Sequence, residues 1–424
     1  MLLRVRRGRE TRTEMSGPER NTAASPSRPP ATERSIWPIH ASTCASAVAQ
    51  GALLLLLPLD GLEKGGIFAG FAVPGMLGVG TALVNVPGAM AVTRFGHRAV
   101  MTTGLAAAAL GGVVMALVPT SVLLMAFAAL VCGLGMGVWG LARLTYLAEA
   151  VPLERRGRVI SAVGGVYRLG MLLGPALTGF GADAWGRSAV LFGAALLHAL
   201  SWLVIVLTLP PTPPAAAGST ATPTHNPLGL VLRVAREHGR VLGTAGVAMW
   251  ALALLRSARL LLLPICGTVL GLEPAQVGLI KSWSAAADAL LFYPVGLAMD
   301  RFGRKWSAVP CLLLLSLGVL TIAWADSYAM LVVGGLIAGF GNGLGSGINM
   351  TLAGDFAPAK GRAEFIGVWR LWSDAGAAVA PFVMGAIAEL LVLSAAGAVT
   401  AGLGLAGMFI MAYAVREPLE RETN

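Results

Sequence analysis

Charged side chains that interrupt long apolar segments are the residues of this sequence that could do chemistry. An ionisable group at membrane depth is costly and usually faces a partner or a water-filled cavity. Asp288 lies midway along such a segment, farther from polar loops than any other acid. Burial disfavours a charged carboxyl group and a nearby arginine favours it, so a carboxylate that alternates between an arginine and water can bind and release a proton. Asp288 is therefore the first candidate for proton coupling, and the alternative is a permanent ion pair with a basic residue of segment 242–266.

Two further pairs of charged residues lie inside apolar segments. Arg370 and Asp374 are four residues apart and share a helix face, so either they pair with each other or Asp374 exchanges between Arg370 and a proton. Arg256 and Arg259 are three apart and either present a positive patch to an anionic substrate or extend toward an interface. Arg143 and Lys281 lie nearer to segment ends, where anchoring is expected. The predicted substrate cavity comprises Arg168, Arg256, Arg259, Arg370 and Trp250.

The elements that must position these residues are membrane-spanning helices. The chain is 56% hydrophobic and only 12% charged, with a mean hydropathy of +0.74. A helical crossing needs about 20 apolar residues, so the chain has room for roughly twelve. The apolar runs predict an all-α polytopic membrane protein of two six-helix bundles. The expected spans are 36–59, 66–92, 99–118, 121–147, 159–181 and 188–208, then 242–266, 277–299, 306–325, 328–352, 364–388 and 391–415.

Lysine and arginine concentrate in alternate loops, which places those loops in the cytoplasm. The net charge of +10 is therefore topological, and no nucleic-acid partner is predicted. Both termini and the central loop are expected to be cytoplasmic. The arginine-rich start has no apolar signal segment, and translation from Met15 is an alternative to Met1. The expected organisation is a disordered tail 1–35, a bundle 36–208, a central loop 209–241, a bundle 242–415 and a tail 416–424.

The sequence offers no pattern for a metal, a cofactor or an enzyme. The four cysteines lie alone in apolar runs, with no CxxC pair and no histidine at ligand spacing. No GxxxxGK[ST] motif is present, so ATP hydrolysis by this chain is not predicted. No nucleophile, base and orienting group stand together as in an active site. An ion gradient is the expected source of energy.

The two halves share motifs in the same order. Residues 93–98 match residues 300–305 at an offset of 207. Further matches at an offset of 206 pair Gly133, Gly135 and Gly137 with Gly339, Gly341 and Gly343, and Gly170, Gly174 and Pro175 with Gly376, Ala380 and Pro381. The same register places Arg168 and Asp374 at corresponding depths, where they are expected to face one cavity. The chain is therefore an internal duplication.

The run 296–305, GLAMDRFGRK, resembles the loop signature of the major facilitator superfamily. The resemblance implies twelve helices and a secondary transporter that works by alternating access. It also implies a conformational latch at these loops, in which Asp300 forms charge contacts between helices in one conformation only. The first copy departs from the signature at Ala89, Thr93 and His97, so the second half carries more of this role. The latch residues are Gly296, Asp300, Arg301, Gly303 and Arg304, with Arg94, Gly96 and Arg98 in the first copy.

Gly170, Gly174 and Pro175 resemble a GxxxGP signature of proton-driven exporters in this superfamily. Small residues four apart also let helices approach closely, so helix packing is the alternative interpretation. Ala129 stands where such exporters usually carry an arginine.

These observations favour proton-coupled export of a small amphipathic compound by a monomer in the inner (plasma) membrane. One alternative is an uptake symporter or facilitator for an anionic metabolite, because the sequence has five mid-span arginines and only two mid-span acids. An alternative of another class is a non-transporting receptor or scaffold. The expected partners are the small-molecule substrate, protons and the lipid bilayer.

Overall fold

The computed structural model describes residues 36–117, 121–211, 227–359 and 361–417. The expectations for the tail 1–35 and for a start at Met15 lie outside the described residues. So do the expectations for residues 212–226 of the central loop and 418–424 of the C-terminal tail. Every regular element in the described ranges is a helix.

The first bundle contains two long crossings within one helix. Its elements are α1 (Trp37–Leu83), α2 (Asn85–Phe95), α3 (His97–Leu117), α4 (Val122–Ala150), α5 (Leu153–Trp185) and α6 (Arg187–Thr208). The helical conformation of α1 is broken at Gly66, where φ is 75° and ψ is −172°. Glycine alone adopts this backbone region without strain, so Gly66 divides α1 into the two predicted spans.

The second bundle repeats the first with additions. It consists of α7 (Pro227–Glu237), α8 (Gly239–Val241), a π-helical turn (Leu242–Gly246), α9 (Val247–Val269), α10 (Pro274–Phe302), α11 (Arg304–Ala323), α12 (Tyr328–Leu344), α13 (Ile348–Phe356), α14 (Arg362–Leu390), α15 (Leu393–Phe409) and a second π-helical turn (Ile410–Ala414). Helix α7 lies within the segment that the sequence predicted as a loop. Arg233 of α7 donates to Glu364 of α14 at 2.8 Å, which ties it to the bundle.

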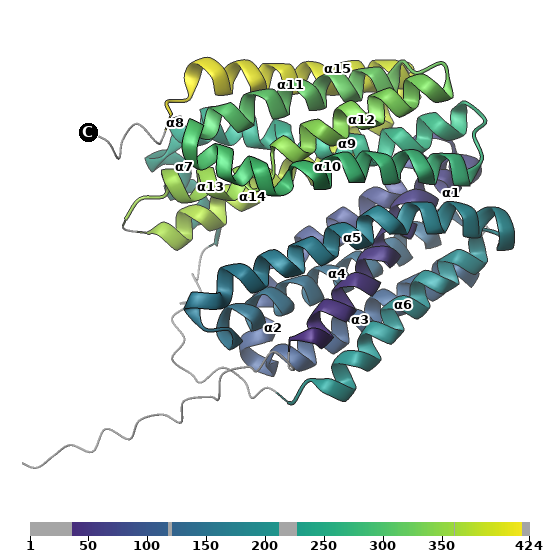
Figure 1. Ribbon diagram of the computed structural model, residues 1–424, viewed down its shortest axis with the longest axis horizontal. Coiled ribbons are helices and arrows are strands. Elements are labelled where there is room, and N and C mark those ends of the chain that lie inside the picture. Colours follow the sequence, from purple (N-terminus) through teal and green to yellow (C-terminus); the bar gives the residue numbers. More distant parts are fainter. Residues whose placement is uncertain (1–35, 118–120, 212–226, 360, 418–424) are drawn as a thin grey trace, which may run out of the picture.

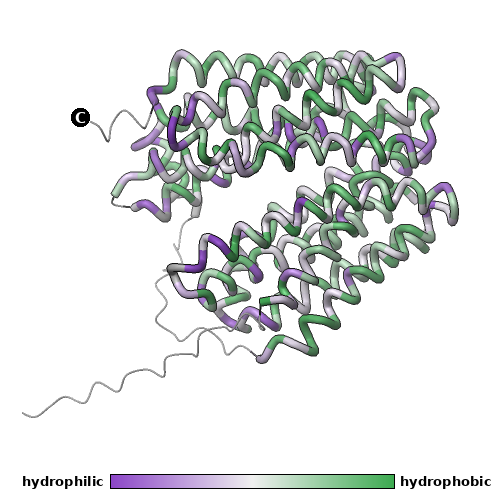
Figure 2. Tube along the Cα trace, in the orientation of Figure 1, coloured by the Kyte–Doolittle hydropathy of each residue, from purple (hydrophilic) through white to green (hydrophobic). Residues whose placement is uncertain are grey.

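Ten helices in the described residues are long and apolar enough to cross a membrane. One of them, α1, supplies two crossings, and the 29-residue α10 adds another. The architecture is therefore consistent with twelve crossings, and the predicted all-helical fold of two bundles is confirmed. Figure 2 shows apolar residues along the helices and hydrophilic residues gathered toward their ends.

The two bundles lie close at one end and diverge at the other (Figure 1). We call the diverging end, which holds the turns at Gly96 and Gly303, the motif end, and the converging end, near Gly66 of α1, the far end. Helix α5 of the first bundle packs against α10 of the second, and α1 of the first packs against α14 of the second. A Cβ on Gly75 of α1 would lie 2.8 Å from the Pro381 side chain of α14, so the halves meet through glycine and proline.

Within the first bundle, α1 and α5 approach through small residues. A Cβ on Gly174 would lie 2.8 Å from the Val48 carbonyl oxygen and 3.1 Å from the Gly51 Cα. The first contact is with backbone, which cannot rotate away. Gly174 is thus required for this crossing, whatever further role the motif has.

We expect Gly174→Ala to lower the free energy of unfolding by about 1–3 kcal/mol, because the added methyl group overpacks the α1–α5 contact. Thermal unfolding in detergent measures the effect. Gly165→Ala in the same helix is the matched control, since no atom lies within 4 Å of its Cβ position. Equal stability of the two variants would contradict the close-packing role.

Candidate functional site

A cavity of about 610 Å³ lies between the two halves. Its walls come from α5 of the first bundle and from α9, α10 and the α12–α13 junction of the second. Apolar side chains such as Met171, Leu260 and Phe292 form part of the lining. The charged residues of the lining are Arg168, Arg256, Arg259, Lys281 and Asp288. Four basic groups therefore share the cavity with one acid.

Asp288 is held by side chains from three other helices. One carboxylate oxygen accepts a hydrogen bond from Arg168 Nη1 at 2.8 Å, and the other accepts one from Asn342 Nδ2 at 2.7 Å. Arg259 Nη2 lies 4.0 Å from the second oxygen. The Arg168 guanidinium also lies 4.4 Å from the centre of the Phe292 ring. The pair Arg168–Asp288 joins the two halves, and each side chain is at most one quarter exposed.

Arg256 and Arg259 are fixed by neutral acceptors of α12 and the turn that follows it. Arg256 Nε donates to Asn342 Oδ1 at 2.8 Å, and its Nη2 donates to the Gly345 carbonyl at 2.8 Å. Arg259 Nη1 donates to the Ala338 carbonyl at 3.3 Å. Because these acceptors carry no charge, the positive charge of the two guanidiniums remains uncompensated except by Asp288. The cavity therefore attracts anions.

Lys281 differs from its expected role as an interface anchor. It is only 6% exposed and lines the cavity. Helix α10 begins at Pro274, seven residues earlier, so Lys281 lies about 10 Å inside the helix. Apolar runs alone suggested a position near the segment end, but the helix extends beyond the apolar run. Arg143, also expected as an anchor, donates to Thr43 at 2.9 Å inside the first bundle.

Three predicted residues lie away from the lining of this cavity. Arg370 is exposed and Asp374 is half-buried, and among the described residues no ion pair joins them. Trp250 packs against α14, where a Cβ on Gly376 would lie 3.2 Å from its ring. The expectation that Arg168 and Asp374 face one cavity does not match the lining, which includes Arg168 alone. Equivalent depth does not place two side chains on equivalent helix faces.

No metal site was predicted, and the described residues contain no cluster of three or more His, Cys, Asp or Glu side chains that could hold a metal. All four cysteines are free thiols, and three are buried.

The far end is closed by two carboxylates that cap helices of the opposite half. Asp183 at the end of α5 accepts from the Ala275 backbone N–H at 3.2 Å, at the start of α10. Glu389 at the end of α14 accepts from the Phe68 N–H at 3.2 Å, just after the break in α1. The two acids are 206 residues apart and the two donors 207 apart, so the contacts are copies of one another. Sequence reasoning missed both, although the repeat register could have aligned them.

We expect the double variant Asp183→Asn and Glu389→Gln to favour opening of the far end, because an amide oxygen is a weaker acceptor than a carboxylate at a helix N-terminus. Loss of about 0.5–1 kcal/mol per contact corresponds to roughly a fivefold to thirtyfold change in the open fraction. The distance between spin labels at positions 185 and 390 measures it, because Trp185 and Leu390 lie at the far end on opposite halves. An unchanged distance distribution would contradict a gating role for these caps.

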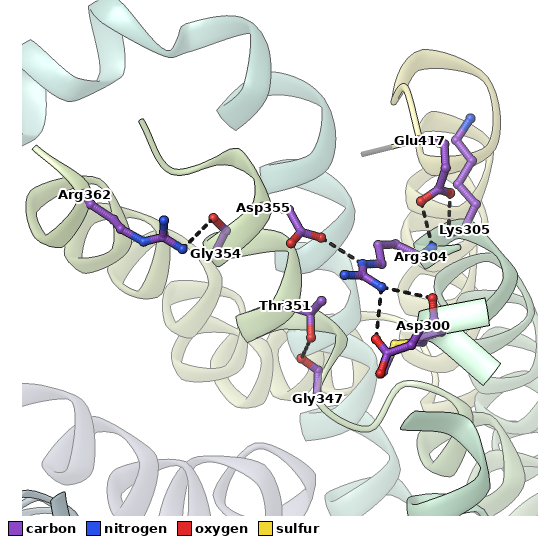
Figure 3. Close-up of polar contacts among 10 residues, drawn as sticks. Asp300, Arg304, Lys305, Gly347, Thr351, Gly354, Asp355, Arg362 and Glu417 are labelled. Atoms are coloured by element: carbon purple, nitrogen blue, oxygen red, sulfur yellow. Dashed lines mark hydrogen bonds and ion pairs between the residues drawn. The ribbon is translucent and has the colours of Figure 1, made fainter. Parts of the chain in front are cut away.

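At the motif end, Arg304 connects α10, α11 and α13 (Figure 3). Its Nε donates to Asp355 at 2.8 Å, and its Nη1 donates to the Met299 carbonyl at 3.0 Å and to Asp300 at 3.3 Å. Gly303 makes the turn with φ of 94°. All of these contacts stay within the second half. In this conformation Asp300 is largely exposed, and its charge contact is with Arg304 of its own half.

Glu417 is a motif-end residue that the sequence assigned only to the tail. Its carboxylate accepts from the Arg304 N–H at 2.7 Å and the Lys305 N–H at 3.0 Å, which caps the start of α11 (Figure 3). Lys305 Nζ donates to the Ala412 carbonyl at 2.8 Å. Glu417 and Lys305 thereby tie α11 to the end of the last crossing.

The first copy of the loop uses histidine where the second uses arginine. His97 Nε2 lies 3.5 Å from Glu149, and these residues correspond to Arg304 and Asp355 by the repeat register. Arg98 donates to the Val206 carbonyl at 2.6 Å. The remaining arginines, Arg94 and Arg301, lie over the rings of the phenylalanines that follow them.

We expect His97→Arg to stabilise the first bundle by about 0.5–1 kcal/mol, because a permanent cation replaces a ring that is charged only when protonated. Thermal unfolding measures the gain, and Glu149→Gln should abolish it.

Comparisons with known protein sequences point to one family. The sequence model described as "Major Facilitator Superfamily" matches residues 39–262 and 245–424. Among curated proteins, the chain is 29% identical over 144 residues to the minor myo-inositol transporter IolF of Bacillus subtilis strain 168, covering 33% of this chain and 28% of that protein. It is 35% identical over 89 residues to the MFS-type transporter ucsD of Acremonium sp, covering 21% of this chain and 15% of that protein.

Solved structures share the fold over nearly the whole chain. The nucleoside transporter NupG (D323A mutant) matches with a TM-score of 0.73 at 15% identity, covering 90% of this chain and 100% of that chain. The human organic anion transporter MFSD10 matches with a TM-score of 0.64 at 19% identity, covering 89% and 99%. A peptide transporter POT in complex with sulfate matches with a TM-score of 0.73 at 15% identity, covering 89% and 94%.

Proposed function

Because the chain belongs to the major facilitator superfamily, we propose that it is a secondary transporter that carries a small organic anion through the central cavity by alternating access. The observation that supports this substrate class is the charge of the cavity. Four basic side chains line it together with the single acid Asp288. An anion binds such a site favourably, whereas a cationic compound meets net repulsion.

The apolar part of the lining indicates an organic anion. Met171, Leu260, Leu263 and Phe292 line the same cavity as the basic groups. A carboxylate attached to an apolar body would place its charge near the arginines and its body against these side chains. This proposal favours the anionic alternative over export of a cationic amphiphile.

Asp288 acts in this proposal as the counter-ion that keeps the cationic cavity folded. It contacts Arg168 of the first half and Asn342 of the second, and Arg259 lies nearby. The two guanidiniums balance the negative charge of this carboxylate. Proton coupling is assigned to the second candidate, Asp374.

The orientation follows from the basic loops. We place the motif end and both chain ends in the cytoplasm of the inner membrane, because Arg304, Lys305 and the other basic loop residues gather there. The divergence of the bundles at that end makes this conformation an inward-facing one (Figure 1).

Transport by purified protein in vesicles tests the proposal. We expect accumulation of radiolabelled benzoate or succinate, and Arg256→Gln should reduce the rate at least about tenfold, because a charge-assisted contact to the substrate is lost. The matched control is Arg236→Gln on exposed α7. Collapse of an imposed proton gradient by tetraphenylphosphonium, with no response to either acid, would overturn the anion assignment in favour of amphiphile export. Silence to all three would support a non-transporting protein.

A further inference from the structure

Lys281 is bound by both halves of the protein at once. Its ammonium donates to the Leu54 carbonyl of α1 at 2.9 Å and to the Leu260 carbonyl of α9 at 2.9 Å. Leu54 belongs to the first half, and Leu260 and Lys281 to the second. The side chain is 6% exposed and lies on the wall of the central cavity.

The two carbonyls are available because each is followed four residues later by a proline. Pro58 lies inside α1 and Pro264 lies inside α9. A proline has no N–H, so the carbonyl four residues before it loses its helical hydrogen bond. A buried carbonyl without a donor is unfavourable, and Lys281 satisfies both.

These two carbonyls are equivalent in the repeat, but the lysine is not duplicated. Pro58 and Pro264 are 206 residues apart, as are Leu54 and Leu260. At the offset of 207 that relates the two loop motifs, Lys281 corresponds to Pro74. One ammonium therefore serves a pair of sites, one in each half.

We propose that Lys281 is a clasp through which anion binding in the central cavity releases the far end. The clasp comprises Lys281 and the carbonyls of Leu54 and Leu260. The substrate part of this inference rests on the proposed transport of organic anions. The clasp itself rests on the contacts alone.

The release follows from the three donors of an ammonium group. Two are used by the carbonyls, and the third is free to meet a ligand in the cavity. A carboxylate is a stronger acceptor than a neutral carbonyl, so an anion competes for the lysine. The acceptor that is lost must be Leu54, because α1 belongs to the other half and moves away when the far end opens. The other charged groups of the cavity are Arg168, Arg256, Arg259 and Asp288, and no carboxylate among the described residues contacts the lysine.

A proline variant tests the clasp without touching Lys281. Pro58→Ala supplies an N–H that takes up the Leu54 carbonyl within α1, so the lysine loses its partner in the first half. Pro310→Ala is the matched control. Pro310 lies inside α11, and the helices that pack against α11 in the described residues belong to the second half. Spin labels at positions 185 and 390 report the far end, because Trp185 and Leu390 are exposed there on opposite halves. The native cysteines are replaced by alanine in every variant.

We expect Pro58→Ala to raise the far-end-open fraction about fivefold in distance distributions, and Pro310→Ala to leave it unchanged. An unchanged fraction in a folded Pro58→Ala protein would overturn the clasp. Lys281→Met should raise the open fraction in the same way, and should remove the further opening that added benzoate or succinate causes in the parent protein.

The two proposals fail in different ways. If neither acid changes the parent distribution while Pro58→Ala still opens the far end, the clasp stands and the anion assignment is wrong. If the acids open the parent and Lys281→Met equally, anion transport stands and Lys281 is not the residue that senses the anion.

Discussion

Asp288→Asn is expected to abolish transport and to lower the free energy of unfolding by about 2 kcal/mol. The carboxylate accepts from Arg168 at 2.8 Å and lies 4.0 Å from Arg259, so its neutralisation leaves cationic groups facing one another. Removing one member of a buried ion pair costs about 3–5 kcal/mol, and an exposed pair contributes at most about 1 kcal/mol. The partial exposure of this pair places it between those limits. Thermal or denaturant unfolding in detergent, with transport of benzoate alongside, measures both effects.

The control for this variant is Asp326→Asn, which neutralises an exposed acid in the loop after α11. Adding Arg168→Gln to Asp288→Asn should recover part of the stability, because the unpaired guanidinium is removed together with its partner. Transport should not return, since the cavity then lacks the Arg168–Asp288 ion pair between the halves. Full transport by Asp288→Asn with unchanged stability would show that Asp288 is not the counter-ion of this cavity.

Gly303→Ala is expected to destabilise the second bundle by about 3 kcal/mol, the upper limit of the cost of backbone strain in this region. Gly303 adopts φ of 94° and ψ of 168°, a conformation that residues with a side chain rarely occupy. Its added Cβ would also lie 2.9 Å from the Glu417 carboxyl carbon, which caps α11. The variant therefore combines strain with loss of the cap, and transport should fall with it.

Gly186→Ala separates the two causes. Gly186 has nearly the same backbone, with φ of 84° and ψ of 156°, but no atom lies within 4 Å of its Cβ position. It should cost about 1–2 kcal/mol from strain alone. The difference between the two glycine variants in thermal unfolding then measures the Glu417 contact, and equal losses would show that this contact contributes nothing.

The membrane-spanning helices, the internal duplication and the loop motifs could be predicted from the sequence alone. Each depends on local properties: the length of apolar runs, the spacing of glycines and the charge of loops. The repeat register also contains alignments that predict contacts. It aligns Asp183 with Glu389 and Pro58 with Pro264, and both pairs turn out to occupy equivalent places in the two halves.

Which charged residues meet depends on how the helices pack in three dimensions. Arg168 and Asp288 are 120 residues apart and pair across the halves, whereas Arg370 and Asp374, four apart on one helix, lie outside the cavity. Lys281 was expected to be an anchor, but in the structure it contacts both halves. The physical reason is that spacing fixes the depth of a side chain, but the face it presents depends on how each helix is rotated and packed against its neighbours.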